Sequence, residues 1–160
     1  MIEINSVIDL KPYYKKDIEK GINGYIFNDD INIKCDLNLQ LSKLNIYAEN
    51  IHANNLSALN IWSNNIFARS LKADNIYSQK IECTENIKVK NTFSPTECIC
   101  SYLEASYIKL SKLDCTGVKA TTLTAHELTA NEIFVSQLSV FGKITAHTIG
   151  KKSQANFKIF

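Results

Sequence analysis

Aliphatic residues return at every fifth position over a long stretch of the chain. The first run has nine members without a gap: Leu41, Ile46, Ile51, Leu56, Ile61, Ile66, Leu71, Ile76 and Ile81. Two residues after each comes a small residue, with Lys43 as the exception: Ala48, Ala53, Ala58, Ser63, Ala68, Ala73, Ser78 and Cys83. The repeating unit is therefore aliphatic, any residue, small, any residue, polar.

The same unit continues in the second half of the chain. It shifts by one residue at Ile87, is disturbed around Phe93 and Pro95, and shifts again near Gly142, before Ile144 and Ile149. Between these shifts the aliphatic series runs Cys98, Leu103, Ile108, Leu113, Val118, Leu123, Leu128, Ile133 and Leu138. The repeat thus extends over residues 41–150.

This period excludes a helix and a flat strand. Five residues turn an α-helix about 140° beyond one full turn, which scatters the aliphatic residues over every face. In a flat strand, an odd step places successive aliphatic residues on opposite faces. A chain that turns a corner every five residues keeps them all inside, so the pattern predicts an all-β solenoid of very short strands.

The unit, for example Asn50-Ile51-His52-Ala53-Asn54, resembles the repeat of the pentapeptide-repeat family. It departs from that family's order because the large residue precedes the small one. The resemblance implies a four-sided, right-handed β-helix of about 20 residues per coil, and hence about five to six coils. On that coil length Glu49 lies beneath Arg69, and Tyr47 beneath Phe67.

Asparagine supplies the corners. The chain contains 17 Asn against five Gly and two Pro, and Asn is a turn residue. Asn stands directly before the aliphatic residue at Asn45, Asn50, Asn55, Asn60, Asn65 and Asn75.

The solenoid needs covers at its ends, because open ends expose the core and unpaired backbone groups. Residues 1–40 are predicted to form an amino-terminal cap and a leading strand, with Pro12 opening a short helix through Lys20 and Gly21 closing it. Residues 151–160 form a carboxyl-terminal tail. Phe157, Ile159 and Phe160 are predicted to cover the last coil of a symmetry mate and form a homodimer; the alternative is a tail folded onto its own column.

Charge and composition restrict the functional class. The net charge is +2, which argues against direct nucleic-acid binding, and no apolar run could span a bilayer. Cys83, Cys98, Cys100 and Cys115 occupy inward positions, and Cys35 lies on the inward side of the leading strand. These unpaired thiols, and the absence of a secretory signal, predict a reducing, cytoplasmic location without disulfides or bound metal.

No catalytic motif is present, so we expect neither an enzyme nor a cofactor. On a 20-residue coil His126 and His147 stack after the shift at Gly142, above Ser106, which is too few ligands for a metal site. His52 is expected to stand alone in solvent.

Aromatic residues gather at outward positions in the first half of the repeat. Tyr47, Trp62, Phe67 and Tyr77 directly follow an aliphatic residue, and Leu59 is also predicted to point outward. Such residues form either a stacking ladder or a partner-binding patch. We favour a patch, and hence a non-catalytic scaffold that binds a protein partner.

Two other functions stay open. Some pentapeptide-repeat proteins mimic duplex DNA and inhibit topoisomerases, and inhibition of another nucleic-acid enzyme, such as a bacterial defence complex, is the main alternative. Residues 31–150 carry 11 basic and 10 acidic side chains, which argues against duplex mimicry. An enzyme with an unrecognised site is the third reading.

Overall fold

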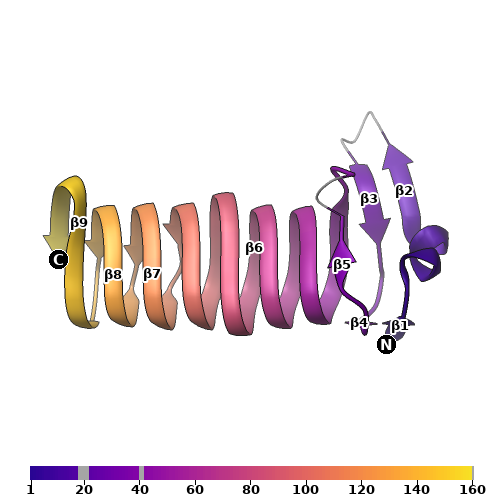
Figure 1. The fold of residues 1–160 in the computed structure, drawn as a ribbon, viewed down its shortest axis with the longest axis horizontal. Helices are drawn as coiled ribbons and strands as arrows, with labels where there is room; N and C mark the ends of the chain where they lie inside the picture. The colour runs from indigo at the N-terminus through magenta and orange to yellow at the C-terminus, as the bar shows by residue number, and fades with distance from the viewer. Residues whose placement is uncertain (18–21, 40–41, 160) are drawn as a thin grey trace.

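The chain winds into a column of parallel coils behind a small amino-terminal cap (Figure 1). The computed structural model describes residues 1–17, 22–39 and 42–159, with the backbone alone for residues 150–159. The column has about seven turns and consists of β6 (Asn45–Lys109), β7 (Lys112–Ala125), β8 (Glu127–Val140) and β9 (Ile144–Ile159). The predicted all-β β-helix is confirmed.

Each coil is three-sided, so the predicted four-sided section is wrong. Leu103 of β6 pairs with Val118 of β7, which pairs in turn with Ile133 of β8. Each step is 15 residues, or three repeats, instead of the predicted 20. A five-residue period sets the length of one side, and any whole number of sides keeps the aliphatic residues inward.

The shorter coil also changes which residues are neighbours, so both predicted stacked pairs are wrong. Arg69 Nε donates to Glu85 Oε1 at 2.7 Å rather than meeting Glu49. Tyr47 stacks on Trp62 rather than on Phe67.

The three sides form three faces, which are named here by their most distinctive side chains. The aromatic face comprises the segments that begin at Ile46, Ile61, Ile76, Phe93, Ile108, Leu123 and Leu138; the cysteine face those at Ile51, Ile66, Ile81, Cys98, Leu113, Leu128 and Ile144; and the lysine face those at Leu56, Leu71, Ile87, Leu103, Val118 and Ile133. In each segment the first and third residues point inward and the second points outward.

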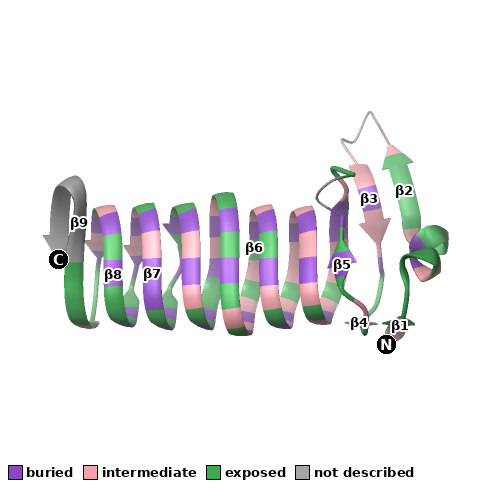
Figure 2. Cartoon of the chain, in the orientation of Figure 1, coloured by how far each residue is buried: buried purple, intermediate pink, exposed green. Residues whose placement is uncertain are grey.

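The core is one continuous apolar column (Figure 2). Every aliphatic position from Ile46 to Leu138 is buried, and most of the small positions are as well. Phe93 and Pro95, where the pattern is disturbed, also fill inward positions and are buried. Ala58 is 0% exposed and Ala125 is 1% exposed, so these positions are sterically closed.

Asparagine side chains form a ladder at each of the three corners. Asn60 Nδ2 donates to Asn45 Oδ1 at 2.8 Å, and Asn75 Nδ2 donates to Asn60 Oδ1 at 2.6 Å. The other two corners have equivalent bonds, from Asn65 to Asn50 and from Ser70 to Asn55. The side-chain amide both donates and accepts, so identical residues can repeat along the column.

Acidic residues of the cap continue two of these ladders. Asn50 Nδ2 donates to Asp30 Oδ1 at 2.6 Å, and Asn55 Nδ2 donates to Asp36 Oδ1 at 2.8 Å. A carboxylate accepts without donating, which suits it to the first position of such a ladder.

The cap contains short strands and one 3-10 helix. Its elements are β1 (Ile2–Ile4), η1 (Val7–Tyr13), β2 (Tyr14–Asp17), β3 (Ile22–Ile26), β4 (Ile31–Ile33) and β5 (Leu37–Asn38). The last three of these strands pair in parallel with the first coil of β6. No helix in the described residues is long and apolar enough to cross a membrane.

A short helix in the cap is confirmed, but its predicted start at Pro12 is wrong. The Asp9 carboxylate accepts hydrogen bonds from the backbone N–H groups of Asn5 and Ser6, at 2.9 and 3.0 Å, and the helix begins at Val7. Pro12 lies inside η1, and the following residues pair with β3 instead of continuing the helix. The predicted end at Lys20 and Gly21 lies outside the described residues.

The carboxyl-terminal backbone continues the column of its own chain. In β9, Phe157 pairs in parallel with Leu138 of β8, and Ile159 pairs with Val140. The side chains of Phe157 and Ile159, and all of Phe160, lie outside the described part. The homodimer therefore stays a prediction.

Candidate functional site

Three outward rings form a ladder on the aromatic face. Tyr47 and Trp62 stack with centroids 4.5 Å apart and planes 2° from parallel, and Trp62 and Tyr77 stack at 5.6 Å and 14°. The three residues occupy the same position in successive coils, so the 15-residue coil brings them into register. Neighbouring coils lie about 4.8 Å apart, which suits stacked rings.

The ladder exposes ring edges more than ring faces, because each face is covered by the next ring. Tyr77 is the most exposed, at 37%, and the outward residue of the next segment is the small Ser94. Burial raises the pKa of Tyr47, and a hydrogen bond with Asn45 partly offsets the rise. The site therefore combines a rigid apolar row with polar edges.

A shallow groove of about 570 Å³ accompanies the ladder. Its lining includes the three rings, the amino-terminal Phe27, and the polar residues Glu49, Ser63, Asn64, Ser78 and Gln79. An apolar row bordered by polar side chains is the composition of a protein interface.

The other two predicted partner-binding residues lie elsewhere. Phe67 is on the cysteine face, where it stacks on His52 with centroids 4.8 Å apart. His52 is thus not alone in solvent, as predicted. Leu59 is half-buried at the corner between the lysine and aromatic faces, where its N–H donates to the Leu44 carbonyl at 2.8 Å. The five residues share no single face.

The expected stacking of two histidines is wrong. His126 lies at the corner between the aromatic and cysteine faces, where its backbone N–H donates to the Ser111 carbonyl at 3.0 Å. His147 follows Ala146 at the next corner, between the cysteine and lysine faces. In the described part of the chain, no group of three or more His, Cys, Asp or Glu residues could hold a metal ion.

The cysteines are free thiols inside the column. Cys83, Cys98, Cys100 and Cys115 are buried and Cys35 is half-buried. Burial raises the pKa of Cys83. A hydrogen bond with Cys100, together with burial, raises the pKa of Cys115. The Cys115 bond lowers the pKa of Cys100, but a bond with Cys98 and burial raise it overall. These thiols are therefore poor nucleophiles in the folded protein.

Sequence reasoning missed a second surface feature, a groove on the lysine face. It is lined by Lys72, Lys88, Lys90 and Lys119 with Glu104 among them, and its volume is about 430 Å³. The sequence signal was present as lysines spaced about one coil apart, but it becomes visible only on the 15-residue coil.

No protein-family model, curated protein or solved structure matches this chain. The similarity to the pentapeptide-repeat family therefore stays a prediction from the repeat unit, as does the right-handed winding that it implies.

Proposed function

We propose that this protein is a non-catalytic scaffold that binds a protein partner along its aromatic face. The supporting observation is the ladder of Tyr47, Trp62 and Tyr77 beside a groove bordered by polar side chains. Aromatic residues in a rigid, partly desolvated row are the usual anchors of a protein interface. The column holds them without a flexible loop, so little entropy is lost when a partner binds.

The test is partner capture with paired variants. The wild-type protein, a variant with Trp62→Ala and Phe67→Ala, and a control with Ile99→Ala are each used to capture proteins from a lysate. Ile99 is 52% exposed on the cysteine face in a later coil. We expect the same protein to be captured by the wild type and the control, and to be lost with the double variant.

The ladder changes how the double variant is interpreted. Trp62 stacks on both Tyr47 and Tyr77, and each aromatic pair is worth about 0.5–1.5 kcal/mol. We therefore expect a modest fall in the unfolding temperature, and the capture is performed well below it. A Trp62→Phe variant keeps the ladder and should keep stability. Normal capture by the double variant would show that the rings serve the column alone.

The same capture tests the alternative function. Recovery of a nucleic-acid enzyme, followed by inhibition of that enzyme by the purified protein, would favour the inhibitor hypothesis over a general scaffold.

A further inference from the structure

A straight groove runs along the lysine face over four successive coils. Its lining includes the inward small-position residues Ala73, Val89, Ala105 and Ala120. Because the residues before and after each of these point outward, the groove lies between two rows of outward side chains. Three coil steps of about 4.8 Å make it about 14 Å long.

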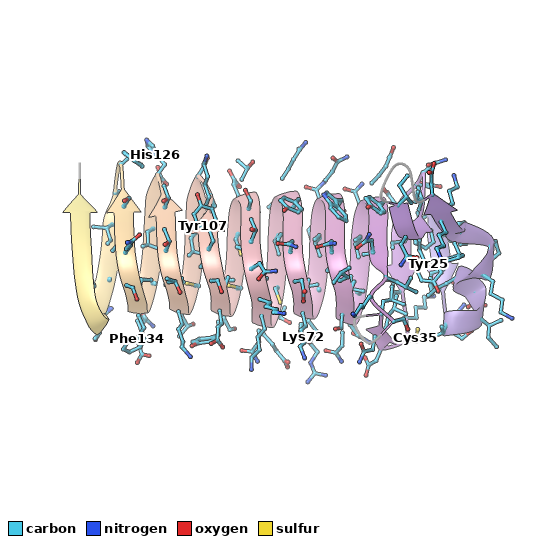
Figure 3. The ribbon with its side chains drawn as sticks, turned by 90° about the horizontal axis from the view of Figure 1, so that it is seen from above. Tyr25, Cys35, Lys72, Tyr107, His126 and Phe134 are labelled. Atoms are coloured by element: carbon cyan, nitrogen blue, oxygen red, sulfur yellow. The ribbon has the colours of Figure 1, made fainter. Side chains whose placement is uncertain are left out.

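The walls of this groove are strongly basic. One row consists of Lys72, Lys88, Glu104 and Lys119, and the facing row of Lys90, Ser106 and Thr121. Four ammonium groups and one carboxylate make a local charge of +3. Lys72 and Phe134 are labelled on the same side of the column in Figure 3, and Phe134 is the outward residue that follows Lys119 by one coil.

The arrangement of charge differs from that at the neighbouring corner. Between the aromatic and cysteine faces, Glu97 pairs with Lys112, and Lys112 pairs with Glu127, so opposite charges alternate along the column. On the lysine face, Lys72 and Lys88 hold the same outward position in consecutive coils. Like charges in neighbouring strands repel, and an anion between them would relieve that repulsion.

The wall chemistry selects among anionic ligands. Lysine and hydroxyl groups supply many donors, whereas the single carboxylate, Glu104, already accepts from Lys119 Nζ at 2.8 Å. The lining contains no aromatic side chain on which a base or sugar could stack. The coils on either side are paired with each other, so no free strand edge is available to hold a peptide backbone.

We propose that the lysine-face groove binds a linear oligophosphate. Such a chain offers only acceptor oxygens to the protein, bears charge along its whole length, and needs no stacking partner. Lysine binds phosphate as a point charge without a fixed bidentate geometry, which suits a uniform polymer. This site is separate from the aromatic face, and the inference is independent of the proposed function.

The test measures the affinity of the full chain for tripolyphosphate and for long-chain polyphosphate by calorimetry at low ionic strength. Lys72→Gln and Lys88→Gln should each weaken binding about fivefold, the scale of one lysine facing an anionic surface. Glu104→Gln should strengthen binding, because it removes the one carboxylate and releases Lys119. Added salt should weaken binding of the wild type.

Lys109→Gln is the matched control. Lys109 is exposed at the same repeat position on the aromatic face, between Ile108 and Leu110, so the substitution removes the same charge outside the groove. We expect unchanged affinity. A loss equal to that of Lys88→Gln would show diffuse attraction to a cationic protein and would overturn the proposal.

Three further ligands test the choice of oligophosphate. ATP, a single-stranded oligothymidylate and a polyglutamate peptide are measured under the same conditions. Weaker binding of all three than of polyphosphate supports the proposal. Equal or tighter binding of the oligonucleotide or the peptide overturns it in favour of that class, and equal binding of ATP assigns the site to a nucleotide triphosphate. Thermal melts of each variant confirm that the column is intact.

Discussion

Replacing Asn60 with alanine should destabilise the column far more than its position near the surface suggests. Asn60 is the middle member of a corner ladder: its Nδ2 donates to Asn45 Oδ1, and its Oδ1 accepts from Asn75 Nδ2. In the described residues no buried side-chain nitrogen or oxygen lacks a hydrogen-bond partner. The substitution would remove both bonds at once.

The magnitude follows from the two bonds and the groups they leave behind. Each bond contributes about 1 kcal/mol net, and a polar group stranded in a buried site costs about 1–3 kcal/mol. Asn45 is only 5% exposed, so its oxygen has little access to water. We expect Asn60→Ala to lower the free energy of unfolding by about 2–4 kcal/mol, at about 2–4 °C of unfolding temperature for each kcal/mol.

The assay is urea unfolding followed by circular dichroism, with Asn64→Ala as the control. Asn64 is exposed in the same coil, and Ser78 Oγ donates to its backbone carbonyl at 2.9 Å, a bond that alanine retains. The control should change stability by less than about 0.5 kcal/mol. If Asn60→Ala costs no more than the control, the ladder does not stabilise the column and the reasoning fails.

A second variant, Asn60→Asp, tests the same ladder through pH. The carboxylate can still accept from Asn75, but it faces the Asn45 oxygen and cannot donate to it. Burial should raise its pKa above that of an unfolded Asp, about 3.9. Relative to the wild type, the variant should therefore lose stability as the pH rises above this value and recover it below, where the protonated acid donates again.

Three other substitutions and conditions probe the packing, the thiols and the surface. Ala58→Leu or Ala125→Leu should overpack a closed position and cost about 1–3 kcal/mol in urea unfolding; an unchanged midpoint would contradict the close packing. The buried thiols should resist alkylation in the native state, and rapid labelling of three or more would contradict their placement. Because their pKa values are raised from 9.0, their contribution to stability is fully present below pH 9, and it should be lost above that pH as the unfolded-state thiols ionise while the folded ones stay protonated. Arg69→Gln should cost at most about 1 kcal/mol, and less in high salt, because its ion pair with Glu85 is exposed; a larger loss would show that this pair supports the corner.

The repeat pattern predicted the core residue by residue. Positions Ile46 to Leu138 of the aliphatic series are buried, and even Phe93 and Pro95 took inward positions where the pattern was disturbed. The reason is local: in a five-residue segment with one corner, alternation alone decides which side chains point inward. The outward placement of Tyr47, Trp62 and Tyr77 followed from the same alternation.

The neighbours of each outward residue could not be predicted in this way. Tyr47 meets Trp62 rather than Phe67, and Arg69 meets Glu85 rather than Glu49. These contacts depend on how many segments close one coil. The aromatic spacing of Tyr47, Trp62 and Tyr77 was a signal for 15 residues, but a predicted 20-residue coil hid it.

The sequence by itself determined that this protein is a solenoid, where its core lies, and which side chains face solvent, because these depend on alternation within five residues. Only the tertiary structure decided that the coil has three sides. That number depends on how the corners bend and on how the inward side chains fill one layer, which are interactions between segments rather than within one. The aromatic ladder and the lysine groove both result from this closure, since side chains 15 or 16 residues apart become neighbours only when three segments complete a turn.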